Sequence, residues 1–454
     1  MQETARAGTF SDRVVVMFGT QVVVVAVGIV NGILLARVLG PAGKGDYYLL
    51  VLLPTTMSIL LQLGLPQAFE FFAARGQTAG LTGKSFVLTA VLSIIGLAVV
   101  VVFLPILQGA ILHGIGTELV LLALCVLPFI LQAPLSAAIV IGRQAVRWYA
   151  AIYLCQPLST TILLAILVWA LGWGVPGAIL VVVLVAVINA IGFTIGAIRV
   201  SRTVPQPGTA PVHELVSYGL RFYPGSLADF FDYRTDAYLI AFLIANPAES
   251  LGYYSLSVAL AEMVFLFPSV VATIFFPHVA GSNREDADRQ VALVSRVTLI
   301  VSGAFALLLI PVAIAMIWTV LPAFGQSIPP FLVLLPGVVA LSGAKVVGGY
   351  VTGIGRPGIC SIVSVIALAV NVVVNLALIP RLGIIGAATA SLVSYTLSSL
   401  LLTVVAARFS HAPAWRYWIP DIDDARYVAT TTAGLVRRAY EGARLLADER
   451  RGHA

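Results

Sequence analysis

Long, uninterrupted apolar runs dominate the pattern of hydrophobic and polar positions along this chain. Residues 14–36, 85–105 and 161–198 carry almost no charge, and only the segment 172–174 interrupts the last run. About 20 apolar residues are needed to cross the hydrocarbon core of a bilayer as a helix rising ~1.5 Å per residue. Backbone groups inside a bilayer must pair within the chain, and the alternation that a membrane barrel requires is missing. The runs therefore predict transmembrane helices.

The same pattern predicts about twelve such helices and their orientation. Their approximate ranges are 14–36, 47–67, 85–105, 118–141, 149–171, 175–198, 215–244, 252–276, 291–318, 329–352, 358–379 and 384–407. One side of the membrane then receives most loop cations, namely Arg6, Arg13, Arg75, Lys84, Arg143, Arg147, Arg199, Arg202, Arg284, Arg289, Arg296, Arg356 and Arg408. The other side receives Arg37, Lys44 and Arg381. Because cytoplasmic loops are enriched in Lys and Arg, both termini are expected in the cytoplasm, as an even helix count also requires.

Composition narrows the class further. Hydrophobic residues make up 60% of the 454 and charged residues only 10%, far from the balance of a soluble globular enzyme. The net charge of +6 comes largely from loop arginines that topology explains, so no nucleic-acid partner is expected. The three cysteines lie in apolar segments without paired spacing, and neither a histidine pair with metal spacing nor a nucleophile elbow is present. We therefore expect a protein that is not an enzyme, with no metal, other cofactor or catalytic residue.

The segment Gly83-Lys84-Ser85 looks like the end of a phosphate-binding loop, but the glycine required five positions before Gly83 is Thr78. No ATPase domain or ATPase subunit is therefore implied. Any driving force is expected from an ion gradient, the membrane potential or consumption of the product.

A weak internal repeat divides the chain. Residues 199–214 form a Pro- and Gly-punctuated linker between predicted helical domains at 1–198 and 215–407, and a polar tail follows at 408–454. Gly40-Pro41-Ala42 recurs as Asn246-Pro247-Ala248, and Ile141-Gly142-Arg143 recurs as Ile354-Gly355-Arg356, in order and at a nearly constant offset. The sequence thus predicts an all-α polytopic membrane protein, with two pseudo-symmetric six-helix bundles around a central cavity.

Charged side chains inside the predicted helices mark a candidate site. The helix at 215–244 carries Arg221, Asp229, Asp232, Arg234 and Asp236, and later helices add Glu262 and Lys345. A charge at a helix centre costs about 2.5–3.5 kcal/mol on insertion scales, so such a residue normally faces a cavity or a partner. Asp229, Asp232 and Asp236 share one helical face, and Arg234 points roughly away from the last two. The amino-terminal half has only neutral polar residues at depth, namely Gln21, Asn31, Gln62, Gln132, Gln156 and Asn189.

Three segments resemble a known family. LARVLGPAGKGDYYLL at 35–50, the helix pair at 231–280 and NVVVNLALIPRLGIIGAATASLVSY at 371–395 are similar to corresponding units of the polysaccharide biosynthesis, or oligosaccharide flippase, family. That family belongs to the multidrug/oligosaccharidyl-lipid/polysaccharide exporter superfamily. The resemblance covers about residues 13–407. It implies alternating-access movement of a polyprenyl-pyrophosphate-linked saccharide across the bacterial plasma membrane, with membrane lipids as the other partners.

The resemblance gives the charges possible roles. Arg234, Lys345 and Arg221 are candidate anchors for the pyrophosphate, since a guanidinium donates bidentate bonds to phosphate. Asp229, Asp232, Asp236 and Glu262 are candidate coupling sites for H+ or Na+. The alternative is a structural network in which these carboxylates only neutralise the cations. Asn371 and Asn375, four residues apart on one helix, either line the cavity or bond between helices.

Two other functions remain open from the sequence. An ion-coupled exporter of small cationic drugs, from the same superfamily, would suit the acidic face of the helix at 215–244. A membrane glycosyltransferase or polymerase would need a catalytic carboxylate and sizeable outer loops, and every predicted outer loop here is short.

Overall fold

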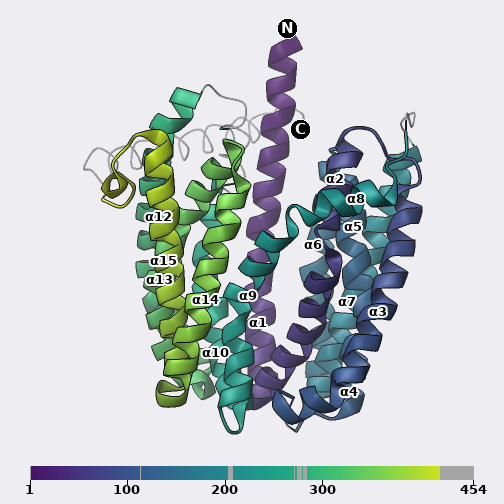
Figure 1. The fold of residues 1–454 in the computed structure, drawn as a ribbon. Helices are drawn as coiled ribbons and strands as arrows, with labels where there is room; N and C mark the ends of the chain where they lie inside the picture. Colours follow the sequence, from purple (N-terminus) through teal and green to yellow (C-terminus); the bar gives the residue numbers. More distant parts are fainter. Residues whose placement is uncertain are drawn as a thin grey trace, which may run out of the picture. The chain divides into compact units, whose positions relative to one another are not determined.

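The computed structural model describes residues 2–112, 114–202, 208–269, 271–272, 279 and 284–419, and this part of the chain is almost entirely helical (Figure 1). The first half contains α1 Gln2–Gln62, α2 Leu65–Ala74, α3 Leu81–Ala110, α4 Thr117–Leu124, α5 Leu127–Gly142, α6 Val146–Leu163, the π-helix Leu164–Ala170 and α7 Gly174–Arg202. The second half contains α8 Val212–Leu220, α9 Tyr223–Leu243, α10 Pro247–Glu262, α12 Arg284–Val320, α13 Ile328–Gly353, α14 Pro357–Leu382 and α15 Ile384–Ser410. Short 3-10 turns lie at Met263–Phe265, Pro322–Ser327 and Ala414–Tyr417.

Ten helical segments within the described ranges are long and apolar enough to cross a membrane, which confirms the predicted all-α, multi-pass architecture. Two of the predicted helices, at 14–36 and 47–67, fall in one continuous segment that bends at Gly40. The predicted helix at 215–244 is instead two helices, α8 and α9, which are separated at Arg221–Phe222. Because α9 carries four charged side chains, it is too polar to count among the ten apolar segments.

The repeated turns share positive φ angles. Gly40 and Asn246 both adopt positive φ angles, of 66° and 56°, and each precedes a proline that starts the next helix. Gly174 and Gly383, before the last helix of each half, also share this conformation, with φ angles of 55° and 58°. Left-handed residues are rare outside glycine and asparagine. The local repeat seen in the sequence is therefore present in the backbone, while the domain boundaries at 1–198 and 215–407 stay a prediction.

Packing divides the chain into two compact units that do not follow sequence order. The first unit contains the described residues up to Met263, together with Pro311–Leu334 and Ser364–Ser394. The second contains Leu335–Val363 and the described residues of Val264–Ile310 and from Tyr395 onward. The candidate site described below lies within the first unit, except for Lys345.

The end of the central linker docks on helices of the amino-terminal half. Thr209 forms an isolated antiparallel bridge with Thr78, and the Lys84 ammonium donates to the Ala210 carbonyl at 2.5 Å. Leu215 of α8 is fully buried in a core shared with α2, α3, α5 and α7. Gly219 lies against Gly64 so closely that a Cβ on either residue would meet the other's backbone. The helix α8 is thus packed into the amino-terminal half of the chain.

Candidate functional site

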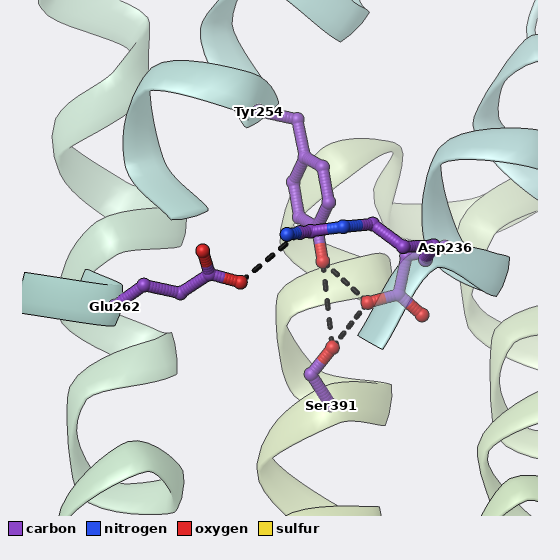
Figure 2. Close-up of polar contacts among 5 residues, drawn as sticks. Asp236, Tyr254, Glu262 and Ser391 are labelled. Atoms are coloured by element: carbon purple, nitrogen blue, oxygen red, sulfur yellow. Dashed lines mark hydrogen bonds and ion pairs between the residues drawn. The ribbon is translucent and has the colours of Figure 1, made fainter. Parts of the chain in front are cut away.

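A buried carboxylate, Asp236 of α9, lies at the centre of a hydrogen-bond network within the first unit (Figure 2). Its side chain is only 2% exposed. The Tyr254 hydroxyl donates to Asp236 at 2.5 Å, and the Asn375 amide donates at 2.6 Å. The Ser391 hydroxyl donates to the same carboxylate and also lies 3.4 Å from the Tyr254 hydroxyl. Helices α9, α10, α14 and α15 each contribute one group, and all the donors described here are neutral.

The network continues through α14 and α15 toward Asp232. Asn375 also donates to the Asn371 side-chain oxygen at 2.8 Å, and Asn371 donates to the Ser394 hydroxyl at 3.3 Å. Ser394 donates to the Ser391 carbonyl at 3.2 Å and lies beside Asp232, which is 6% exposed. The two carboxylates, one helical turn apart on α9, thus lie beside the same row of amides and hydroxyls.

Two oxygens of this network have no hydrogen-bond donor among the described residues: Oδ1 of Asp232 and Oδ1 of Asn375, both buried. A buried polar atom without a partner carries a desolvation penalty of ~1–3 kcal/mol, which a proton or a cation would remove. Hard cations prefer such carboxylate and amide oxygens. Groups of three or more His, Cys, Asp or Glu residues with metal-binding geometry are absent from the part of the chain that the structure describes. The donor atoms of this network are all oxygens, the ligand type that protons and hard cations accept.

Arg234 of α9 pairs with Glu262 at the end of α10. Its Nη1 lies 3.0 Å from the Glu262 carboxylate, and the two side chains remain 28% and 32% exposed (Figure 2). Tyr48 of α1 lies beside Arg234. An ion pair with this exposure can exchange partners, because solvent screens it and its net contribution to stability is small.

The remaining candidate residues lie elsewhere. Asp229 is exposed on α9, and Arg221 is exposed at the break between α8 and α9. Lys345 of α13 belongs to the second unit, where its ammonium lies over the Phe265 ring at 4.5 Å from the centroid. The structure therefore brings together Asp232, Asp236, Asn371 and Asn375 in one network, and Arg234 with Glu262 in a second.

Sequence reasoning missed Tyr254, Ser391 and Ser394. Tyr254 belongs to the Tyr253-Tyr254 pair that repeats Tyr47-Tyr48, so its repeated position was the available signal. Ser391 and Ser394 lie three residues apart on α15, the spacing that places two side chains on one helical face. Serine is too common in this chain for that spacing alone to identify them.

Comparison with known proteins decides the family. A model of the polysaccharide biosynthesis protein family matches residues 11–282, which is more than half of the chain. The chain belongs to this family.

The match confirms the resemblance drawn from residues 35–50 and 231–280, while the third segment, at 371–395, lies beyond it. The chain is also 25% identical over 173 residues to a protein named probable flippase AglR of Haloferax volcanii. That alignment covers 37% of this chain and only 36% of the relative, about a third of its length.

Solved structures show the same fold for this family member. An outward-facing multidrug resistance MATE family transporter of the MOP superfamily matches with a TM-score of 0.64 at 14% identity, covering 88% of this chain and 96% of that one. The lipid II flippase MurJ, in an inward closed conformation, matches with a TM-score of 0.63 at 12% identity, covering 92% of each chain. At these identities the likeness establishes the fold alone.

Proposed function

We propose that this chain is a flippase that moves a lipid-linked oligosaccharide across the plasma membrane by alternating access, for the synthesis of a surface polysaccharide. Membership of the polysaccharide biosynthesis family supports this cargo, as does the relative named as a probable flippase. The observation that carries a transport function is the buried network around Asp236, because a carboxylate held at depth among membrane helices marks an ion or substrate pathway.

In this proposal Asp232 and Asp236 form the coupling site. The Asp232 carboxylate accepts a proton, or the Oδ1 atoms of Asp232 and Asn375 bind Na+, from one side of the membrane and release it on the other. Asp236 of α9 and Asn375 of α14 are in direct contact. Binding of the ion beside them would stabilise this contact between the two helices. The cation thus favours one conformation of these helices by its differential affinity, as any coupled transporter requires.

The loop charges support a location in the plasma membrane with both termini in the cytoplasm. AglR belongs to an archaeon, so the proposal covers a prokaryotic plasma membrane and includes the bacterial one implied by the sequence resemblance. Membrane lipids and the lipid-linked saccharide are the proposed partners.

Depletion of this protein from its own cells tests the proposed cargo. Surface glycan is expected to fall, and the lipid-linked saccharide is expected to accumulate in a form that a membrane-impermeant glycosidase cannot reach from outside. Mass spectrometry of extracted lipids measures the accumulation. Unchanged lipid-linked pools together with increased sensitivity to cationic drugs would replace this function with drug export.

A charge exchange tests Arg234 as the pyrophosphate anchor. Arg234→Ala is expected to reduce glycan display by roughly tenfold or more, since a charge-assisted contact to phosphate contributes ~1.5–3 kcal/mol. The double variant Arg234→Glu/Glu262→Arg restores the ion pair with its polarity reversed, and its thermal unfolding midpoint is expected to match that of the wild type.

The same double variant separates the two roles of the pair. If Arg234 anchors the pyrophosphate, the double variant does not restore glycan display, although its ion pair is present. If the pair is only structural, glycan display returns with the pair, and the proposed anchor is wrong. Glu262→Gln provides the matched control, because it weakens the pair and leaves the guanidinium in place.

A further inference from the structure

A cavity lies within the amino-terminal half of the chain, between α1, α5, α6 and α7. Its volume is about 530 Å³, within the ~300–1,000 Å³ range of small-molecule sites. None of the residues that line it is Asp, Glu, Lys or Arg. The cavity is therefore not suited to a pyrophosphate, which needs charged partners.

One wall of the cavity is a row of aromatic rings. Tyr149 and Tyr153, one turn apart on α6, stack with centroids 5.6 Å apart and planes 14° from parallel. Phe193 of α7 continues the row at 5.5 Å from Tyr149. Such rings offer a broad apolar surface while the tyrosine hydroxyls keep a polar edge. This combination matches the two sides of a pyranose ring, whose C–H face is apolar and whose rim carries hydroxyls.

A sugar hydroxyl also needs a hydrogen-bond acceptor inside the cavity, and Asn189 of α7 provides one. Its side chain is 7% exposed and lines the cavity. Its Nδ2 donates to the Val185 carbonyl at 3.1 Å, which fixes the orientation of the amide. Its Oδ1 is buried and has no donor among the described residues. Gln156, exposed at the edge of the cavity, adds a second amide.

We infer that this cavity binds the neutral saccharide part of the cargo, with sugar rings on Tyr149 and Tyr153 and a sugar hydroxyl donating to Asn189 Oδ1. The assignment rests on the proposed function, and it adds that different parts of the chain bind different parts of the cargo. The charged groups of the carboxy-terminal half act on the pyrophosphate and the coupling ion, and this uncharged cavity recognises the glycan. A lipid chain would fill the same volume but would leave the Asn189 oxygen without a donor, at a cost that a sugar hydroxyl avoids.

Ligand-observed NMR tests the inference without any transport. The full-length protein is placed in phosphatidylcholine nanodiscs, since glycoside detergents would themselves occupy a sugar site. Saturation transfer is then measured to three oligosaccharides (a maltotriose, a chitobiose and an oligouronate) and to inorganic pyrophosphate. At least one oligosaccharide is expected to receive saturation, strongest on its ring C–H protons.

Variants locate the binding. Asn189→Leu and Tyr153→Leu are expected to reduce the oligosaccharide signal at least fivefold, while Tyr153→Phe, which retains the ring, keeps most of it. Asn31→Leu is the matched control, because both ends of the Asn31 amide are bonded, to the Pro157 carbonyl and to Thr161, and it lies outside the cavity. The pyrophosphate signal is expected to be unchanged in all four variants.

Each contrary result has a distinct meaning. No saturation of any of the three sugars, or equal loss in Asn31→Leu and Asn189→Leu, overturns the saccharide site. Entry of a spin-labelled acyl chain into the cavity, stronger in Asn189→Leu and without any sugar binding, would assign the cavity to lipid instead. Because binding is measured in purified protein, a failure here leaves the depletion result on lipid-linked pools unaffected, so the two proposals fail separately.

Discussion

Replacing Asp236 by asparagine is expected to abolish transport while leaving the amount of folded protein unchanged. The substitution preserves the shape of a side chain that is 2% exposed but removes its charge and presents an amide to three donors. Without the Asp236 carboxylate, the coupling site that it forms with Asp232 is incomplete, and glycan display should fall to the level of depleted cells. Buried charges are costly, so the thermal unfolding midpoint is expected to stay level or rise.

Asp229→Asn is the matched control for this prediction, because it makes the same change at an exposed position on the same helix. Its glycan display is expected to stay within about twofold of the wild type, since exposed substitutions have small effects. Normal transport by Asp236→Asn would remove the carboxylate from the mechanism. A midpoint that falls in step with transport would instead make Asp236 a structural residue.

Gly252→Leu is expected to block transport by holding α1 and α10 apart. Gly252 lies against the Pro41 carbonyl, and Gly45 lies reciprocally against the Ala248 carbonyl, so a Cβ at either glycine would overlap the backbone of the other helix. Backbone cannot move aside as a flexible side chain can, so the two helices must separate at this end, which is predicted to face outward. Alternating access needs this end to close, and glycan display should therefore be lost.

Accessibility of a reporter cysteine distinguishes a blocked gate from a misfolded protein. Thr56→Cys, in a background without Cys125, Cys155 and Cys360, lies on α1 roughly 16 Å along the helix from Gly45. A membrane-impermeant maleimide added outside is expected to label it several-fold faster when Gly252→Leu is present. Gly109→Leu, where a Cβ meets open space, should change neither labelling nor transport. Wild-type labelling in an inactive Gly252→Leu variant would mean that the helices did not separate.

The membrane class and the all-α, multi-pass architecture could be predicted from the sequence, because the length of the apolar runs determines them locally. The family could be predicted from the resemblance of residues 35–50 and 231–280. The acidic face of α9 was also predictable, since helical periodicity alone places Asp232 and Asp236 together. So was the proximity of Asn371 and Asn375, four residues apart on α14. These are properties of single helices, and they require no knowledge of how helices pack.

Properties that depend on two or more helices could not be predicted. Which donor reaches Asp236 depends on how α10 and α15 pack against α9, and that packing brings in Tyr254 and Ser391. The break at Arg221–Phe222 was missed because the surrounding residues form an acceptable continuous helix by composition. Burial of Leu215 by helices that precede it by many residues is what divides α8 from α9.

The docking of α8 also has a consequence for the order in which the ribosome and the insertion machinery assemble this protein. Leu215 and Ala210 complete a core whose other members come from α2, α3, α5 and α7. An amino-terminal chain released only as far as Arg202 would therefore leave an apolar surface uncovered at the membrane boundary. The nascent chain covers this apolar surface only after the residues through Leu220 have been synthesised. Membrane chaperones and proteases can therefore bind the surface while residues 203–220 are being made.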